Sequence, residues 1–308
     1  MKIKDFNKQD SMLFRAVAIL MVVIAHYSNL IYDDSGHKIW NLLNKLGRYG
    51  VAIFFLVSGY GLVKSTKGKE LNYLFLLRRV QTVYVPFICM QFLALIFIGI
   101  PHNEMTVKDW ILYFVGIDYW YIIVIFSLYF LFYISMRYIK QYQQIGLFIL
   151  VTGLNILFAL MGCEEWWYLT NYVFCIGVYF AFHEKSEQKR VGTQTLFCFV
   201  GFVLTSIIYP KLEGVILHDL FKIAAALCFS GFVWFAYAVF PFHINLRPIV
   251  KIGECSLYIY ILHVQALTFL KVHNLTSCVA IFLSLIIVIT ISLILERIAA
   301  KISHIKGT

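Results

Sequence analysis

The chain has 308 residues, of which 61% are apolar and only 14% are charged. A soluble domain usually carries about 25% charged residues and about 45–50% apolar ones, so this composition cannot provide the polar surface of a soluble protein. The net charge of +10 does not indicate nucleic-acid binding, because the basic residues are divided among short segments between long apolar runs. Composition therefore favours an integral membrane protein.

About ten apolar runs are long enough to cross the hydrocarbon core of a bilayer, which is about 30 Å thick. Backbone polar groups in lipid need internal hydrogen-bond partners, so these runs are expected to be helices, and they lack the alternation of β-barrel strands. The predicted spans are 12–32, 46–64, 81–100, 119–138, 145–161, 166–183, 193–209, 219–240, 253–272 and 277–297. Segments 70–80 and 104–117 are predicted to be interfacial helices, because neither is apolar enough to cross alone.

The fold class is therefore predicted to be all-α, a polytopic integral membrane bundle of about ten transmembrane helices. We expect a single domain over residues 1–308 with no fused soluble domain. With the N-terminus in the cytoplasm, 19 of the 26 lysine and arginine residues fall on the cytoplasmic side. The positive-inside rule then predicts that both termini lie in the cytoplasm, and we expect a multi-pass protein of the plasma membrane. The 7 cysteines have no CxxC spacing, so neither a metal site nor a disulfide framework is predicted.

The first predicted span carries two ionisable side chains, Arg15 and His26. Their separation of eleven residues brings both to within about 20° of one helix face and about 16 Å apart along the axis. Arg15 falls at the cytoplasmic end of the span, where an arginine that snorkels to the interface is one interpretation. His26 lies past the middle, where an imidazole must hydrogen-bond inside the bundle or face a wet cavity. His26 is therefore a candidate general base, since imidazole titrates near neutral pH.

A second histidine, His263, is predicted at a similar depth. It lies ten residues after Gly253, which corresponds to about 15 Å of helix from the start of its span. Two histidines at one depth of one bundle are expected to meet around a shared cavity. His263 then either orients a substrate group or forms a hydrogen bond that only fixes the bundle.

Two further tracts carry candidate residues. Ser58 in the tract GVAIFFLVSGY could be a nucleophile, but Gly59 and Gly61 beside it favour close packing between helices instead. In the tract LRRVQTVYVP, Arg78 and Arg79 fall at the predicted cytoplasmic interface. Guanidinium groups there bind either the phosphates of a substrate or lipid headgroups.

Taken in order, these tracts resemble the acyltransferase 3 family of membrane-bound acyltransferases over residues 11–298. The resemblance rests on Arg15 and His26, the FFLVSGY tract, the stretch from Arg78 and Arg79 to Pro86, the S-x3-Y-x2-H tract with Ser256, Tyr260 and His263, and Glu296 near the end. Leu257 and Ile261 stand where the family often has tyrosine and leucine, and these departures are mild.

The resemblance implies an acyl-CoA-dependent O-acetyltransferase. Such an enzyme moves an acyl group, usually acetyl from acetyl-CoA, to a hydroxyl of a cell-envelope polysaccharide or lipid-linked glycan. Arg15, Arg78 and Arg79 would bind the phosphates of CoA. His26 would act as general base or carry a transient acyl group, and Arg15 and His263 would complete the catalytic set. A transporter or flippase of envelope glycans is the alternative, since it would also need about ten helices and buried polar groups.

Overall fold

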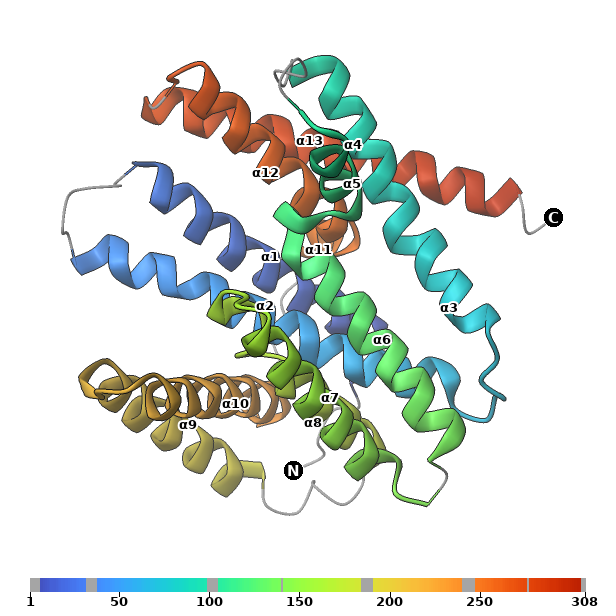
Figure 1. Cartoon of the computed structure of the whole chain (residues 1–308), viewed down its shortest axis with the longest axis vertical. Coiled ribbons are helices and arrows are strands. Elements are labelled where there is room, and N and C mark those ends of the chain that lie inside the picture. Colours follow the sequence, from blue (N-terminus) through green and yellow to red (C-terminus); the bar gives the residue numbers. More distant parts are fainter. Residues whose placement is uncertain are drawn as a thin grey trace. The chain divides into compact units, whose positions relative to one another are not determined.

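The computed structural model describes residues 6–31, 38–98, 105–139, 141–183, 191–239, 247–275 and 277–305, and these residues contain helices and turns but no strand. The helices are α1 Lys8–Ile31, α2 Lys38–Thr66, α3 Leu74–Arg79, α4 Val85–Ile98, α5 Val107–Val115, α6 Trp120–Tyr138, α7 Gln143–Leu160, α8 Tyr172–His183, α9 Val191–Ile208, α10 Val215–Val239, α11 Arg247–Glu254, α12 Ser256–Val272 and α13 Cys278–Ile305 (Figure 1).

The described residues contain 8 helical stretches that are long and apolar enough to cross a membrane, or 9 if α11 and α12 form one broken span. This confirms the predicted class of a polytopic helical membrane protein, with slightly fewer spans than the sequence suggested. The predicted span ends at residues 32, 99–100 and 240, and residue 104 of the second interfacial segment, lie outside the described residues.

The segment 166–183, predicted as one span, is helical only in the 12 residues of α8. That length makes about 18 Å of helix, which is too short to cross a bilayer alone. The preceding residues form the 3₁₀ turn η4, Glu165–Trp167, followed by a further turn. Asn171 holds this turn, because its Nδ2 donates to the carbonyl oxygen of Trp167 at 2.9 Å and to Oδ1 of Asn155 at 2.8 Å. An asparagine bonded in this way competes with helix formation.

The segment 70–80, predicted as an interfacial helix that leads into the third span, is continuous with that span from Leu74 onward. Helix α3 passes through a π-helical turn, η1 Val80–Tyr84, directly into α4. Pro86 follows this turn closely, and a proline inside a helix removes one backbone hydrogen bond and crowds the carbonyl four residues earlier. The π-helical turn therefore lies where the helix has to absorb the break that Pro86 imposes.

The other predicted interfacial segment, 104–117, contains the short helix α5. Its start is fixed by a capping box, in which Asp109 N donates to the Thr106 side chain and the Asp109 carboxylate accepts from Thr106 N. Its end is fixed by Gly116, whose φ of 88° is left-handed and favours glycine. A 3₁₀ turn, η3 Ile117–Tyr119, then leads into α6.

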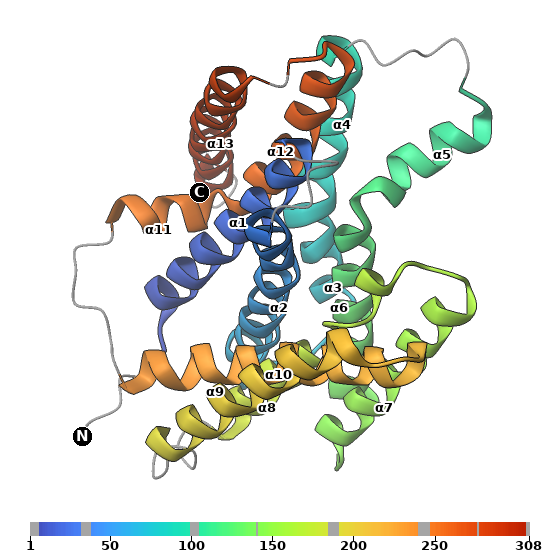
Figure 2. The ribbon, with the colours of Figure 1, turned by 90° about the vertical axis from the view of Figure 1, so that its left-hand side faces the viewer.

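The chain divides into two compact units. The first unit contains residues 1–11, 51–76 and 124–245, and the second contains residues 12–50, 77–123 and 246–308. In the first unit, α9 and α10 pack side by side along their length (Figures 1 and 2). In the second unit, α12 packs against α4 and α13, and α11 meets α12 at a bend of 70° (Figure 2).

Two glycines allow α2 and α8 to cross closely within the first unit. A Cβ atom added to Gly59 would lie closer than 3.0 Å to the carbonyl oxygen of Phe174, and one added to Gly177 would be equally close to that of Leu56. Real Cβ atoms essentially never approach other atoms that closely. The interpretation of the FFLVSGY tract as a packing surface is therefore confirmed at Gly59.

We expect Gly59→Ala to destabilise the first unit by about 1–3 kcal/mol, because the added methyl group meets backbone that cannot easily move. The measurement is thermal unfolding of the purified protein in detergent. Gly61→Ala is the matched control, since a Cβ there would meet no atom of the described chain within 4 Å. Equal melting temperatures for Gly59→Ala and wild type would contradict the proposed crossing.

Candidate active site

Helix α1 carries the first two candidate residues. It runs without interruption from Lys8 to Ile31, so Arg15 and His26 are about 16 Å apart along one helix, as the sequence predicted. Both side chains are half-buried. Across the described ranges, the guanidinium group of Arg15 has no hydrogen-bond or ion-pair partner, so it can receive a ligand.

The structure brings His26 and His263 into direct contact within the second unit. His26 Nδ1 lies 2.7 Å from His263 Nε2, which is a hydrogen bond between the two imidazole rings. The rings are almost parallel, with an interplanar angle of 17° and centroids 5.0 Å apart. His263 is completely buried. The expected meeting of the two histidines is therefore present, whereas their chemical roles stay predictions.

Helix α12 determines which nitrogen of His263 carries a proton. His263 Nδ1 lies 3.1 Å from the carbonyl oxygen of Ile259, one turn earlier in the same helix. A carbonyl oxygen can only accept, so Nδ1 of His263 must carry the proton. In a neutral pair, His263 Nε2 then accepts and His26 Nδ1 donates. His26 Nε2 is consequently left with a free lone pair, which is the atom that a general base needs.

Aromatic rings pack next to His263 on α12. Tyr260 lies with its ring centroid 5.6 Å from that of His263 and 5.2 Å from that of Tyr121. Tyr119 is in edge contact with Tyr260 at 6.2 Å. These rings exclude bulk water from the back of the histidine pair, since Tyr119, Tyr260 and His263 are all buried.

The two arginines of the third candidate tract differ in their surroundings. Arg78 is exposed, and within the part of the chain that the structure describes its guanidinium group has no hydrogen-bond or ion-pair partner. Arg79 is half-buried and has a further interaction within the protein. Of the two guanidinium groups that the sequence proposed for phosphate binding, Arg78 is therefore the more available.

Sequence reasoning missed a group of buried amides in the second unit. Gln265 on α12 hydrogen-bonds to Gln91 on α4 and to Tyr119 in η3. The only sequence signal was the presence of glutamines inside apolar runs, where an unpaired amide is costly. Their spacing along the chain did not indicate that they would meet.

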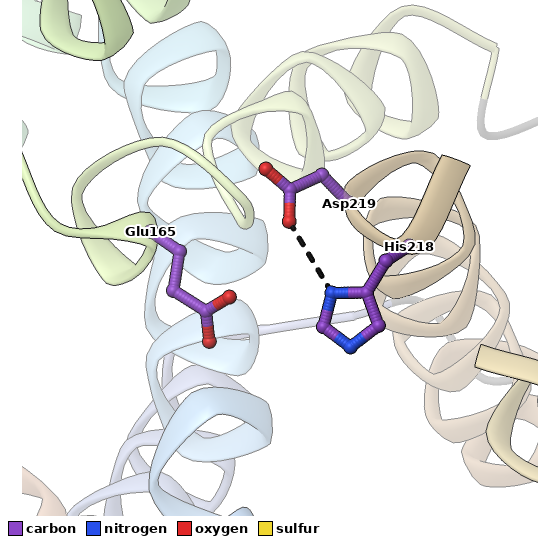
Figure 3. Close-up of side chains that lie close together, drawn as sticks. All are labelled: Glu165, His218 and Asp219. Carbon is purple, nitrogen blue, oxygen red and sulfur yellow. Dashed lines mark ion pairs between the residues drawn. The ribbon is translucent and has the colours of Figure 1, made fainter. Parts of the chain in front are cut away.

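A separate polar cluster lies in the first unit (Figure 3). Glu165, His218 and Asp219 each place one ligand atom within 4.8 Å of the others, a distance that suits a bound divalent cation. However, Lys222 already forms an ion pair with the Glu165 carboxylate. The Lys222 side chain is only 10% exposed, so its ammonium group is a built-in cation at this position. We therefore interpret the cluster as an ion-paired contact between η4 and α10.

Tyr168 completes this cluster. Its hydroxyl donates to Oδ2 of Asp219 at 3.2 Å. Burial, together with the negative charge of Asp219, raises the pKa of Tyr168 above its usual range. Tyr168 consequently stays protonated and continues to donate this hydrogen bond at any physiological pH.

A family model matches most of the chain. The model of the acyltransferase 3 family, which is described as an acyltransferase domain, matches residues 11–297. The match includes parts of both compact units and all the candidate residues on α1, α3 and α12. No curated protein and no solved structure matches the sequence.

The ion pair at Lys222 leads to a test of the cluster in Figure 3. We expect Lys222→Met to lower the free energy of unfolding by about 1–3 kcal/mol, because a carboxylate loses its charged partner. EDTA should leave the melting temperature unchanged. The control is Lys211→Met, which alters an exposed lysine in the nearby 3₁₀ turn η6, Tyr209–Lys211. A melting temperature that falls with EDTA and is restored by a divalent cation would instead indicate a metal site.

Proposed function

Because this chain belongs to the acyltransferase 3 family and is therefore a membrane acyltransferase, we propose that it transfers an acyl group from cytoplasmic acyl-CoA to a hydroxyl group. The proposed donor is acetyl-CoA, and the proposed acceptor is a sugar of the cell envelope or a lipid-linked glycan. The observation that supports this proposal most directly is the hydrogen bond between His26 and His263, which leaves His26 Nε2 free to accept a proton.

In the proposed reaction, His26 Nε2 removes the proton from the acceptor hydroxyl while the oxygen of that hydroxyl attacks the thioester carbonyl carbon. The tetrahedral intermediate collapses, the carbon–sulfur bond breaks, and the CoA thiolate takes the proton back from His26 Nε2. The products are an ester and CoA with a free thiol. During the reaction His26 carries a positive charge, and its Nδ1–H bond to His263 Nε2 becomes charge-assisted and stronger. His263 thus acts through His26, by holding its orientation and its tautomer.

The alternative route is a transient acyl-histidine, in which His26 Nε2 itself attacks the thioester carbon. The same lone pair would serve both routes, because attack also requires an unprotonated Nε2. Rapid quenching with radiolabelled acetyl-CoA distinguishes them, since only the covalent route leaves label on the denatured protein before the acceptor is added. Family membership favours either route over transport of a glycan, which was the alternative function.

Arginines supply the proposed donor site. CoA carries several phosphates, and Arg15 and Arg78 are guanidinium groups without partners in the described structure. Arginine forks suit phosphate oxygens. The distance of about 16 Å from Arg15 to His26 along α1 is a length that an extended pantetheine arm can cover. We propose that the phosphates dock at Arg15 and Arg78, with Arg79 supporting this site from its half-buried position.

We expect His26→Ala to lower the rate of acyl transfer by about 10²–10⁴-fold, which is the usual contribution of a general base. The measurement is release of CoA thiol from acetyl-CoA by the purified protein, with acceptor present. The control is His273→Ala, which removes an exposed histidine just beyond α12. A His26→Ala protein that keeps a rate within a few-fold of wild type would remove His26 from the catalytic assignment.

We expect Arg78→Ala to raise the Michaelis constant for acyl-CoA by about ten-fold or more, since a charge-assisted hydrogen bond contributes about 1.5–3 kcal/mol. The melting temperature should not change, because Arg78 is exposed. Arg79→Ala should both raise the Michaelis constant for acyl-CoA and lower the melting temperature, because Arg79 is half-buried. Arg297→Ala, at an exposed arginine on α13, serves as the control. An unchanged Michaelis constant in both variants would assign Arg78 and Arg79 to lipid headgroups.

A further inference from the structure

Three buried polar side chains meet inside the second unit. Gln265 on α12 places Nε2 at 2.6 Å from Oε1 of Gln91 on α4. The same nitrogen lies 2.7 Å from the hydroxyl oxygen of Tyr119 in η3. Exposure is only 7% for Gln265, 1% for Gln91 and 4% for Tyr119, so water does not replace these bonds.

The Gln265 amide is fully used as a donor. A primary amide has two N–H groups, and each of them bonds to a different element, one in α4 and one in η3. Gln91 is held in turn by Tyr113 on α5, because Gln91 Nε2 donates to the Tyr113 carbonyl at 3.3 Å and the Tyr113 hydroxyl donates to the Gln91 carbonyl at 3.1 Å. Gln265 therefore ties α12 to Gln91 and Tyr119, and Gln91 is itself held by Tyr113.

This contact lies close to the histidine pair along the same helix. Gln265 is two residues after His263, which corresponds to about 3 Å of rise and about 200° of rotation. The two side chains thus leave α12 on nearly opposite sides, His263 toward α1 and Gln265 toward α4. At its start, α12 is separated from α11 by the bend of 70°, so α11 does not continue the helix.

From these contacts we propose that Gln265 is a positioning residue, which together with Gln91 and Tyr119 holds α12 at the rotation and height where His263 Nε2 accepts the proton of His26 Nδ1. The proposal rests on the proposed function of the histidine pair. Rotation or sliding of α12 would carry His263 away from His26, since the 2.7 Å bond between the rings tolerates little movement.

Activity gives the first test. Gln265→Leu removes both hydrogen bonds and puts an apolar side chain of similar size in place of the amide. Gln91→Leu removes the acceptor in α4. We expect either change to lower kcat by about 10²-fold, the cost of a catalytic group misplaced by about 1 Å, and to leave the Michaelis constant for acyl-CoA unchanged. The double variant should lose less than the sum of the two single losses, because both changes remove the shared bond between Gln265 and Gln91 and only the bond from Gln91 to Tyr113 is specific to Gln91→Leu. Additive losses, or a wild-type kcat in Gln265→Leu, would overturn the proposal.

The control separates positioning from stability. Asn155→Leu breaks a buried amide pair in the first unit, where Asn171 Nδ2 lies 2.8 Å from Asn155 Oδ1. It should lower the melting temperature but leave kcat unchanged. Tyr119→Phe is the milder variant should Gln265→Leu fail to fold, because it removes one oxygen atom only. We expect Tyr119→Phe to lower kcat several-fold, and an unchanged kcat would count against the proposal.

A second readout needs neither substrate nor turnover. Nitrogen NMR of the protein labelled with ¹⁵N-histidine reports which nitrogen of each imidazole carries the proton, and comparison with His263→Gln identifies the signals of the pair. In wild type we expect Nδ1 of His263 to be protonated and Nε2 to be a hydrogen-bond acceptor. In Gln265→Leu the acceptor signature at Nε2 should be lost, while Asn155→Leu should retain it.

The kinetic and NMR readouts distinguish an error in the proposed function from an error in the positioning role of Gln265. If the wild-type protein transferred no acyl group from any acyl-CoA while the NMR signature still depended on Gln265, the proposed function would be wrong and the positioning contact would be upheld. If Gln265→Leu kept both the wild-type NMR signature and the wild-type kcat, Gln265 would only join helices, and the positioning role would be refuted.

Discussion

The hydrogen bond between His26 and His263 depends on a general constraint, which is that polar groups inside an apolar bundle must find their partners within the protein. Two polar side chains of α12 meet this constraint. His263 is bonded to α1 and to its own helix, and Gln265 is bonded to α4 and η3. Because both sides of α12 are tied by polar contacts in a medium without competing water, the imidazole pair has a defined geometry before any substrate binds.

Much of this arrangement follows from the sequence. Runs of apolar residues were sufficient to predict the fold class and most helices, because lipid permits few alternatives. The meeting of His26 and His263 followed from counting residues along two spans. Counting could not give the interacting atoms, since these depend on the Ile259 carbonyl and on ring orientation. The Gln265 contact was also hidden, because its partners lie 174 and 146 residues away and carry no periodic pattern.

The errors in the predicted helices have local physical causes. Hydropathy made 166–183 one span, whereas Asn171 closes a turn by bonding to the Trp167 carbonyl and delays the helix. Hydropathy also made 70–80 an interfacial helix ahead of the third span, whereas the helix continues into that span through a π-helical turn next to Pro86. Arg78 and Arg79 looked equivalent as neighbours in sequence, but a step of about 100° between successive residues gives them different exposure.

The bond from His263 to the Ile259 carbonyl has an evolutionary consequence. The acceptor belongs to the backbone, so replacing Ile259 by another residue changes the side chain but leaves the oxygen in place. A catalytic aspartate that orients a histidine can be lost by a single nucleotide change, whereas this acceptor cannot. The proton position in the pair is therefore insensitive to the side chain at position 259, provided that α12 stays helical.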